Sequence, residues 1–126
     1  VTTIFKDSET GHLVFATLHT SGAPNTINRL IDVFPPEQQT QIKAQISESL
    51  KMVVTQKLFK KKDGSGRIAA FEVMVCNSAV KNLIREGKVF QIPGVMQTGQ
   101  RDGMITMEKS IEGLIDSKII NNVEKA

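Results

Sequence analysis

Two histidines, His12 and His19, are the residues of this chain whose type and setting could do chemistry. A short apolar run, residues 12–18, begins at His12, and His19 follows it directly. Gly11 precedes the run, and a polar loop begins at Thr20. Such a run is typical of a strand that is buried on both faces. His19 and Thr20 would then emerge at the carboxyl end of the strand, where open α/β sheets place ligands. A histidine there can donate a hydrogen bond to a phosphate oxygen and report whether a terminal phosphate is present.

Other chemistry at these residues is less well supported. A spacing of seven along a strand sends the two histidines to opposite faces, so we assign no metal site. From spacing alone, two structural histidines remain the simpler interpretation. Cys76 closes a predicted strand with no basic pair beside it, and we interpret it as a buried, inert thiol rather than a nucleophile.

No phosphate-binding loop of the form G-x-x-x-x-G-K-[ST] occurs in the chain. The single Gly-Lys pair, Gly87 and Lys88, is followed by Val89. Gly64 and Gly66 lie between two predicted strands, whereas a phosphate loop must open a helix whose N–H groups face the anion. We therefore interpret these two glycines as turn residues.

The elements that must position the histidines are predicted in the order strand, two helices, hairpin, three helices. The stretches 52–59 and 68–75 are rich in strand-forming residues and flank the polar segment 60–67, which predicts a β-hairpin. Apolar residues at helical spacing mark two helices before it, separated by a proline pair. These residues are Ile27, Leu30, Ile31 and Phe34, then Pro35 and Pro36, then Ile42, Ile46 and Leu50.

The region after the hairpin is predicted to be helical. Ser78 is the predicted N-cap of a short helix that ends at Gly87, and two more helical stretches follow. The last carries an apolar face that we interpret as core packing, without a ligand, and the chain should fray from Asn121. The residues of that face are Met104, Met107, Ile111, Leu114 and Ile115.

Length and composition limit the function classes. With 126 residues the chain has room for one compact unit, and no apolar run approaches the roughly 20 residues that cross a bilayer. The chain begins with Val1 and shows no secretory signal, which favours a cytoplasmic fragment. The excess of 16 basic over 13 acidic residues is too small to impose nucleic-acid binding. We interpret the local basic cluster as a solvated hairpin tip; it comprises Lys57, Lys60, Lys61, Lys62 and Arg67.

Several motifs resemble one family. Residues 9–20 resemble the histidine box of the secretion ATPase superfamily, and residues 25–35, NTINRLIDVFP, are similar to the ATPases that retract type IV pili in twitching motility. The likeness continues in the family's order through residues 47–50, 55–58 and 67–74. Its most specific part is similar to the retraction motif AIRNLIRE, with two conservative changes. That motif comprises Ala79, Val80, Lys81, Asn82, Leu83, Ile84, Arg85 and Glu86.

The resemblance implies an α/β fold. We expect the C-terminal half of a RecA-like ATPase core, a few-stranded sheet with a β-hairpin, followed by a helical C-terminal tail. Residues 1–126 would form one unit. Within it, residues 1–8 are a poorly matched leader, residues 9–76 belong to the core, and residues 77–126 form the helical C-terminal region.

The resemblance also implies a function for the intact enzyme: a homo-hexameric motor that uses ATP and Mg²⁺ to retract the pilus. It would lie in the cytoplasm at the pilus base, peripheral to the inner membrane, and act with the inner-membrane platform protein. His12, His19 and Thr20 would sense the nucleotide, and the helix 79–86 would transmit force. The family's P-loop and Walker B glutamate are absent here, so this chain by itself should bind no cofactor and hydrolyse no ATP.

Two alternatives stay open. A stand-alone interaction module would display the basic hairpin and bind the pilus machinery without nucleotide. Nucleic-acid binding by the basic cluster is the weakest hypothesis, because such binding requires an extensive positive surface. Without the resemblance, outward Asn82, Arg85 and Glu86 would be interpreted as a solvated helix face.

Overall fold

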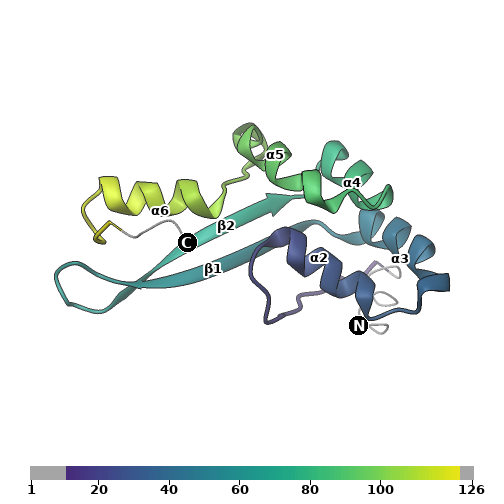
Figure 1. Cartoon of the computed structure of the whole chain (residues 1–126), viewed down its shortest axis with the longest axis horizontal. Helices are drawn as coiled ribbons and strands as arrows, with labels where there is room; N and C mark the ends of the chain where they lie inside the picture. The colour runs from purple at the N-terminus through teal and green to yellow at the C-terminus, as the bar shows by residue number, and fades with distance from the viewer. Residues whose placement is uncertain (1–10, 123–126) are drawn as a thin grey trace.

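The computed structural model describes residues 11–122, in which two groups of helices flank a long β-hairpin and meet at its base (Figure 1). Helices α2 and α3 lie on one side of the hairpin ribbon, and α4, α5 and α6 lie on the other. The predicted order of these helices and strands is confirmed. The elements are α2 (Ala23–Asp32), α3 (Pro36–Ser49), β1 (Met52–Lys60), β2 (Arg67–Val75), α4 (Ser78–Arg85), the 3-10 turn η1 (Val89–Gln91), α5 (Ile92–Gln97), η2 (Gln100–Asp102) and α6 (Met107–Asp116).

The proline pair separates α2 from α3 as predicted. Pro36 is the first residue of α3, where its missing N–H costs little. Ile27 and Ile31 of α2 are buried, and so are Ile42 and Ile46 of α3. Apolar residues at helical spacing therefore turn both helices towards a common core.

The hairpin is regular along its whole length. Met52 opposes Val75 at its base, and Lys60 opposes Arg67 next to the turn. Gly64 and Gly66 have φ angles of 75° and 135°, in the region that favours glycine. Their assignment as turn residues is confirmed.

Strand β2 has a second neighbour. Val73 N–H donates to the Ile105 carbonyl at 2.9 Å, and Ile105 N–H donates back at 3.1 Å. Phe71 N–H donates to Ser110 Oγ at 3.0 Å, so α6 is fixed along the outer edge of β2. α6 starts only after its N-cap Thr106, which corrects the prediction that Met104 lies on its apolar face. The other four residues of that face are half-buried.

The core lies around the base of the hairpin. Most of its buried side chains come from helices α2 to α5 and from the paired residues Val53 and Met74 of the two strands, and Cys76 and Met104 complete it. The far half of the hairpin extends away from α2 to α5 (Figure 1). The structure thus has a packed end and a projecting tip.

The predicted strand at residues 12–18 is wrong for the described part of the chain. This segment has no regular secondary structure, and Leu13 and Phe15 are 78% and 88% exposed. A strand buried on both faces needs a neighbouring strand and a covering layer. Within residues 11–122 the sheet contains only β1 and β2, which pair with each other. The apolar pattern is strand-like, but these residues supply no strand to pair with it.

The predicted N-cap of α4 is wrong by one residue. Asn77, not Ser78, is the cap, and its Oδ1 accepts a hydrogen bond from Val80 N–H at 3.0 Å. Asn77 Nδ2 also donates to Asp102 Oδ2 at 2.8 Å, whereas Ser78 is already the first residue of the helix. Gly87, with φ 73°, ends the helix as predicted.

Candidate functional site

His19 and Thr20 line an open hollow of about 490 Å³ in front of α2. The other lining side chains are Ser21, in the same loop, and four residues along the outer face of α2. Those four residues are Asn25, Asn28, Arg29 and Asp32. His19 and Arg29 are both exposed, so the hollow presents N–H donors to solvent.

The loop before α2 is held by a short chain of hydroxyl groups. Thr26 Oγ1 donates to the Gly22 carbonyl at 2.9 Å, and it lies 2.7 Å from Thr20 Oγ1. A hydroxyl has one proton, and that of Thr26 goes to Gly22, so Thr20 must donate to Thr26. Thr20 therefore offers the hollow its acceptor lone pairs, and its role here is to hold the loop.

The structure does not bring His12 into the hollow. It is exposed, as is most of the segment that carries it, and its side chain does not line the hollow with His19. Residues 9 and 10 of the histidine box lie outside the described residues, as do the leader at residues 1–8 and residues 123–126. Of the two histidines, His19 lines the hollow and His12 does not, so His19 is the candidate ligand group.

Arg29 and Asn28 of this hollow were missed by the sequence analysis. Asn25, Asn28, Arg29 and Asp32 share one helical face at spacings of three and four, opposite the buried face of α2. That polar stripe was visible in the sequence. What it could not show is that the histidine loop folds beside the stripe.

The second predicted site, residues 79–86, is a well-anchored helix. Val80 and Ile84 are completely buried, and α4 packs against α3. Leu83 and Lys81 are half-buried, whereas Ala79 is exposed. The inward residues fix the helix on the core, so its outward residues are held in defined positions.

The outward face of α4 carries a small polar network. Arg85 forms an ion pair with Glu48 of α3 at 3.0 Å and donates to Asn82 Oδ1 at 3.2 Å. Glu86 pairs with Lys88 at 3.3 Å. All these side chains are substantially exposed, so the network contributes little to stability and remains open to a partner.

Cys76 lies between β2 and α4 and is 9% exposed. Burial raises the pKa of its thiol to about 11, although the positive charges of Lys81 and Lys51 oppose the shift. The predicted burial of Cys76 is confirmed, and since the thiolate is the reactive form, a raised pKa is consistent with an inert thiol.

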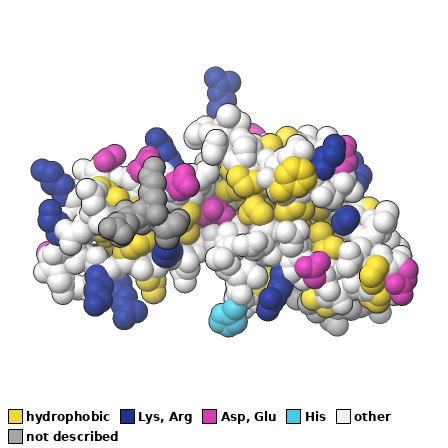
Figure 2. All heavy atoms as spheres, in the orientation of Figure 1, with side chains coloured by type: hydrophobic (Ala, Val, Ile, Leu, Met, Phe, Trp, Pro, Cys, Tyr) yellow, Lys and Arg dark blue, Asp and Glu magenta, His cyan; other side chains and the backbone are white. Residues whose placement is uncertain are grey.

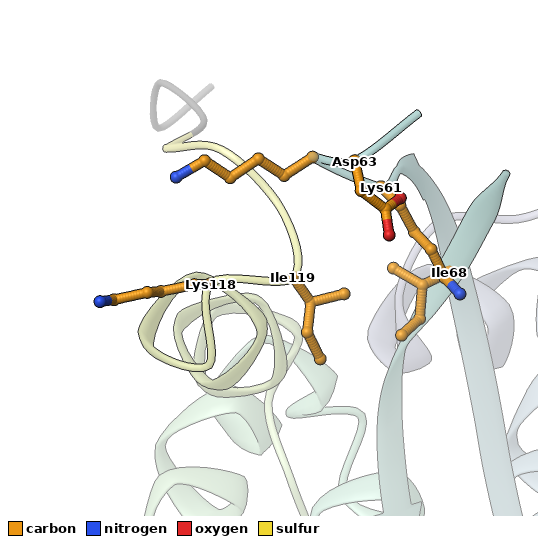
Figure 3. Close-up of a pocket in the computed structure, with 6 residues that line it drawn as sticks. Lys61, Asp63, Ile68, Lys118 and Ile119 are labelled. Carbon is orange, nitrogen blue, oxygen red and sulfur yellow. The ribbon is translucent and has the colours of Figure 1, made fainter. Parts of the chain in front are cut away.

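The hairpin tip is basic but does not form a converging site. Figure 2 shows Lys and Arg side chains spread over this end of the molecule. A hollow lies between the tip and the end of α6, where Ile68 and Ile119 point toward each other and Lys118 points away (Figure 3). Lys62 N–H donates to the Ile119 carbonyl at 2.8 Å and joins the two segments. This arrangement fits a solvated tip.

Among the described residues, no three His, Cys, Asp or Glu side chains are grouped so that they could hold a metal ion. No helix in residues 11–122 has both the length and the apolar character that crossing a bilayer requires.

Comparison with known proteins identifies the class. The profile of the family described as "Type II/IV secretion system protein" matches residues 1–124, and the chain belongs to this family. It is 50% identical over 113 residues to a twitching motility protein of Neisseria gonorrhoeae, covering 90% of this chain and 30% of that protein. It is 47% identical over 114 residues to the type IV pilus retraction ATPase PilT of Pseudomonas aeruginosa, covering 90% of this chain and 33% of the relative.

Solved structures agree with these relatives. The chain matches the pilus retraction motor PilT with bound ADP at a TM-score of 0.85 and 39% identity, over 95% of this chain and 33% of that one. It matches the Legionella pneumophila ATPase DotB at 0.78 and 27% identity, over 94% and 32%. The resemblance to retraction ATPases and the α/β, RecA-like fold class are thereby confirmed. The chain spans about a third of the length of these relatives.

Proposed function

We propose that this chain is the sensing and force-transmitting part of a type IV pilus retraction ATPase. The observation that carries the proposal is its 50% identity over 113 residues to a twitching motility protein. The likeness to a retraction motor with bound ADP supports a nucleotide-driven cycle in the whole protein. Residues 1–126 would act as one unit, with residues 9–76 in the motor core and residues 77–126 as its helical C-terminal region.

His19 would contact the terminal phosphate of ATP bound by the whole enzyme. The donors of the hollow, above all His19 and Arg29, have the chemistry that phosphate oxygens require. Thr20 would keep the loop in place through Thr26, and His12 would support the segment that leads into it. Bound ATP with Mg²⁺ supplies the phosphate whose presence or loss this loop would report.

Helix α4 would transmit the resulting movement. Its buried residues Val80 and Ile84 tie it to the core, while Asn82, Arg85 and Glu86 face outward. A rigid helix with an exposed polar face suits a contact that has to transmit force. In the whole protein that contact would lie in a homo-hexamer or at the pilus platform protein, on the cytoplasmic side of the inner membrane.

A chimera tests the proposal. Residues 1–126 would replace the matching third of the P. aeruginosa retraction ATPase in cells that lack it, and we expect twitching to be restored. His19→Ala should lower both ATP hydrolysis by the purified chimera and twitching. Arg85→Ala should preserve hydrolysis but abolish twitching. Thr40→Ala, an exposed change on α3, is the control. Normal twitching in both site variants would refute the two assigned roles.

The 126-residue chain alone should not hydrolyse ATP, because it lacks the P-loop and Walker B residues that position phosphate, metal and water. Phosphate release by the purified chain, measured with Mg²⁺ and ATP, should not exceed the rate measured in buffer without protein. Metal-dependent turnover would contradict this expectation.

A further inference from the structure

Helix α2 begins without a cap of its own. The N-cap position is Gly22, which has no side chain to accept a hydrogen bond, and the first turn contains no acidic residue. Pro24 lacks an N–H, and the N–H of the completely buried Ala23 has no partner within the helix. Its partner is Glu72 Oε1 of strand β2, at 2.8 Å, from a residue 49 positions away. A carboxylate there also faces the positive end of the helix dipole.

Glu72 connects the histidine loop, residues 19–22, to strand β2 through its hydrogen bond with Ala23 N–H. The local hydrogen bonds of this loop join Thr20 to Thr26, Thr26 to Gly22 and Asn25 to Ser21, residues at most six positions apart. They shape the loop but do not fix it to the sheet. The Glu72 carboxylate does, because it belongs to the hairpin and is half-buried beside the loop.

The same strand leads directly to α4. Two residues beyond the end of β2, Asn77 caps α4 through its bond to Val80 N–H. Met74, next but one after Glu72, is completely buried in the core, so the strand is firmly held. The histidine loop and the helix proposed to transmit force are therefore attached to one rigid strand.

We infer that Glu72 is a positioning residue that ties the loop of His19 to strand β2 and through it to α4. The inference rests on the proposed function for the meaning of the loop, but the tie itself exists without nucleotide. Loss of the carboxylate would release the loop and the start of α2 from the strand while the local threonine contacts persist.

Amide hydrogen exchange and chemical shifts of the 126-residue chain, measured by NMR without ligand, test the tie. In Glu72→Ala we expect the Ala23 amide to exchange about tenfold faster or more, because it loses a bond to a charged acceptor. The amide shifts of residues 19–22 and of the first turn of α4 should change with it. Glu72→Gln, which keeps an acceptor of the same length, should restore most of the protection and also serves if the alanine variant fails to fold.

Glu48→Ala is the matched control, since it removes an exposed glutamate that contacts Arg85 and should leave residues 19–23 unchanged. Unchanged exchange at Ala23 in a folded Glu72→Ala chain would overturn the inference. So would exchange that rises equally throughout the chain, since that reports global instability.

A phosphate titration separates this inference from the proposed function. Inorganic phosphate should shift the His19 signals in the wild type and do so several-fold more weakly in Glu72→Ala. If phosphate moves no wild-type signal, phosphate sensing by the chain fails, while the ligand-free exchange data still decide the role of Glu72.

Discussion

Two regions carry the family motifs, helix α4 and the histidine segment at residues 12–20. They differ in how much of each is buried and capped. α4 has a side-chain cap at Asn77 and two completely buried anchors, Val80 and Ile84. The histidine segment exposes Leu13 and Phe15, and at its end Thr20 is hydrogen-bonded to Thr26 of α2. The comparison teaches that the motif in α4 is held in place by its cap and by burial in the core, whereas the histidine motif depends on contacts from outside its own segment.

The largest expected contrast lies in core packing. Ile84→Ala should destabilise the chain by about 3 kcal/mol, because it removes completely buried methyl groups and leaves a cavity. Leu13→Ala should change stability by less than about 0.5 kcal/mol, since its side chain is already in solvent. Urea unfolding followed by circular dichroism measures both. Equal losses would mean that the histidine segment is packed like α4.

Backbone geometry at the start of α2 gives the next largest effect. Gly22 has φ 85° and ψ 152°, a region that is almost restricted to glycine, so Gly22→Ala should cost about 1 to 3 kcal/mol. Apart from residues next to Gly22 in the sequence, the atom nearest to an added Cβ is Glu72 Oε1, at 3.7 Å. The cost therefore comes from the backbone conformation and not from a steric clash. Gly113→Ala, inside α6 with no atom within 4 Å of the new Cβ, should instead stabilise by about 0.5 to 1 kcal/mol. Thermal unfolding of the two variants should shift in opposite directions.

The cap of α4 tests why this helix is ordered. Asn77→Ala should destabilise by about 1 kcal/mol through loss of the bond to Val80 N–H. Ser78→Ala should have little effect, because alanine is at least as good at the first helical position. The same urea experiment applies, and the reverse ranking would restore Ser78 as the cap.

The smallest effect on stability is expected at the surface of α4. Arg85→Ala should cost only about 0.5 kcal/mol or less, because its partner Glu48 is also well exposed. A small thermal shift together with lost twitching in the chimera would separate a role in force transmission from a role in folding. A loss above about 2 kcal/mol would instead make Arg85 a structural residue.

How much was predictable from the sequence differs between these regions for a physical reason. The hairpin, the proline break and the α4 helix have local signals, since turn glycines and helical spacing act within a few residues. The strand at residues 12–18 was mispredicted because an apolar run indicates which residues favour burial but does not show which strand they would pair with. Glu72 was missed because its partner Ala23 is 49 positions away in the chain. Arg29 was missed because the sequence does not show that the histidine loop folds beside the polar face of α2.

The buried thiol of Cys76 has a practical consequence. Below about pH 9 the thiol is protonated in both the folded and the unfolded chain, so it does not make the free energy of unfolding depend on pH. As the pH rises from 9 towards 11, only the unfolded thiol ionises, and the free energy of unfolding falls. Near neutral pH, an alkylating reagent should therefore label Cys76 only when the junction between β2 and α4 opens. The rate of that labelling would therefore measure how often the junction opens between the strand that holds the histidine loop and helix α4.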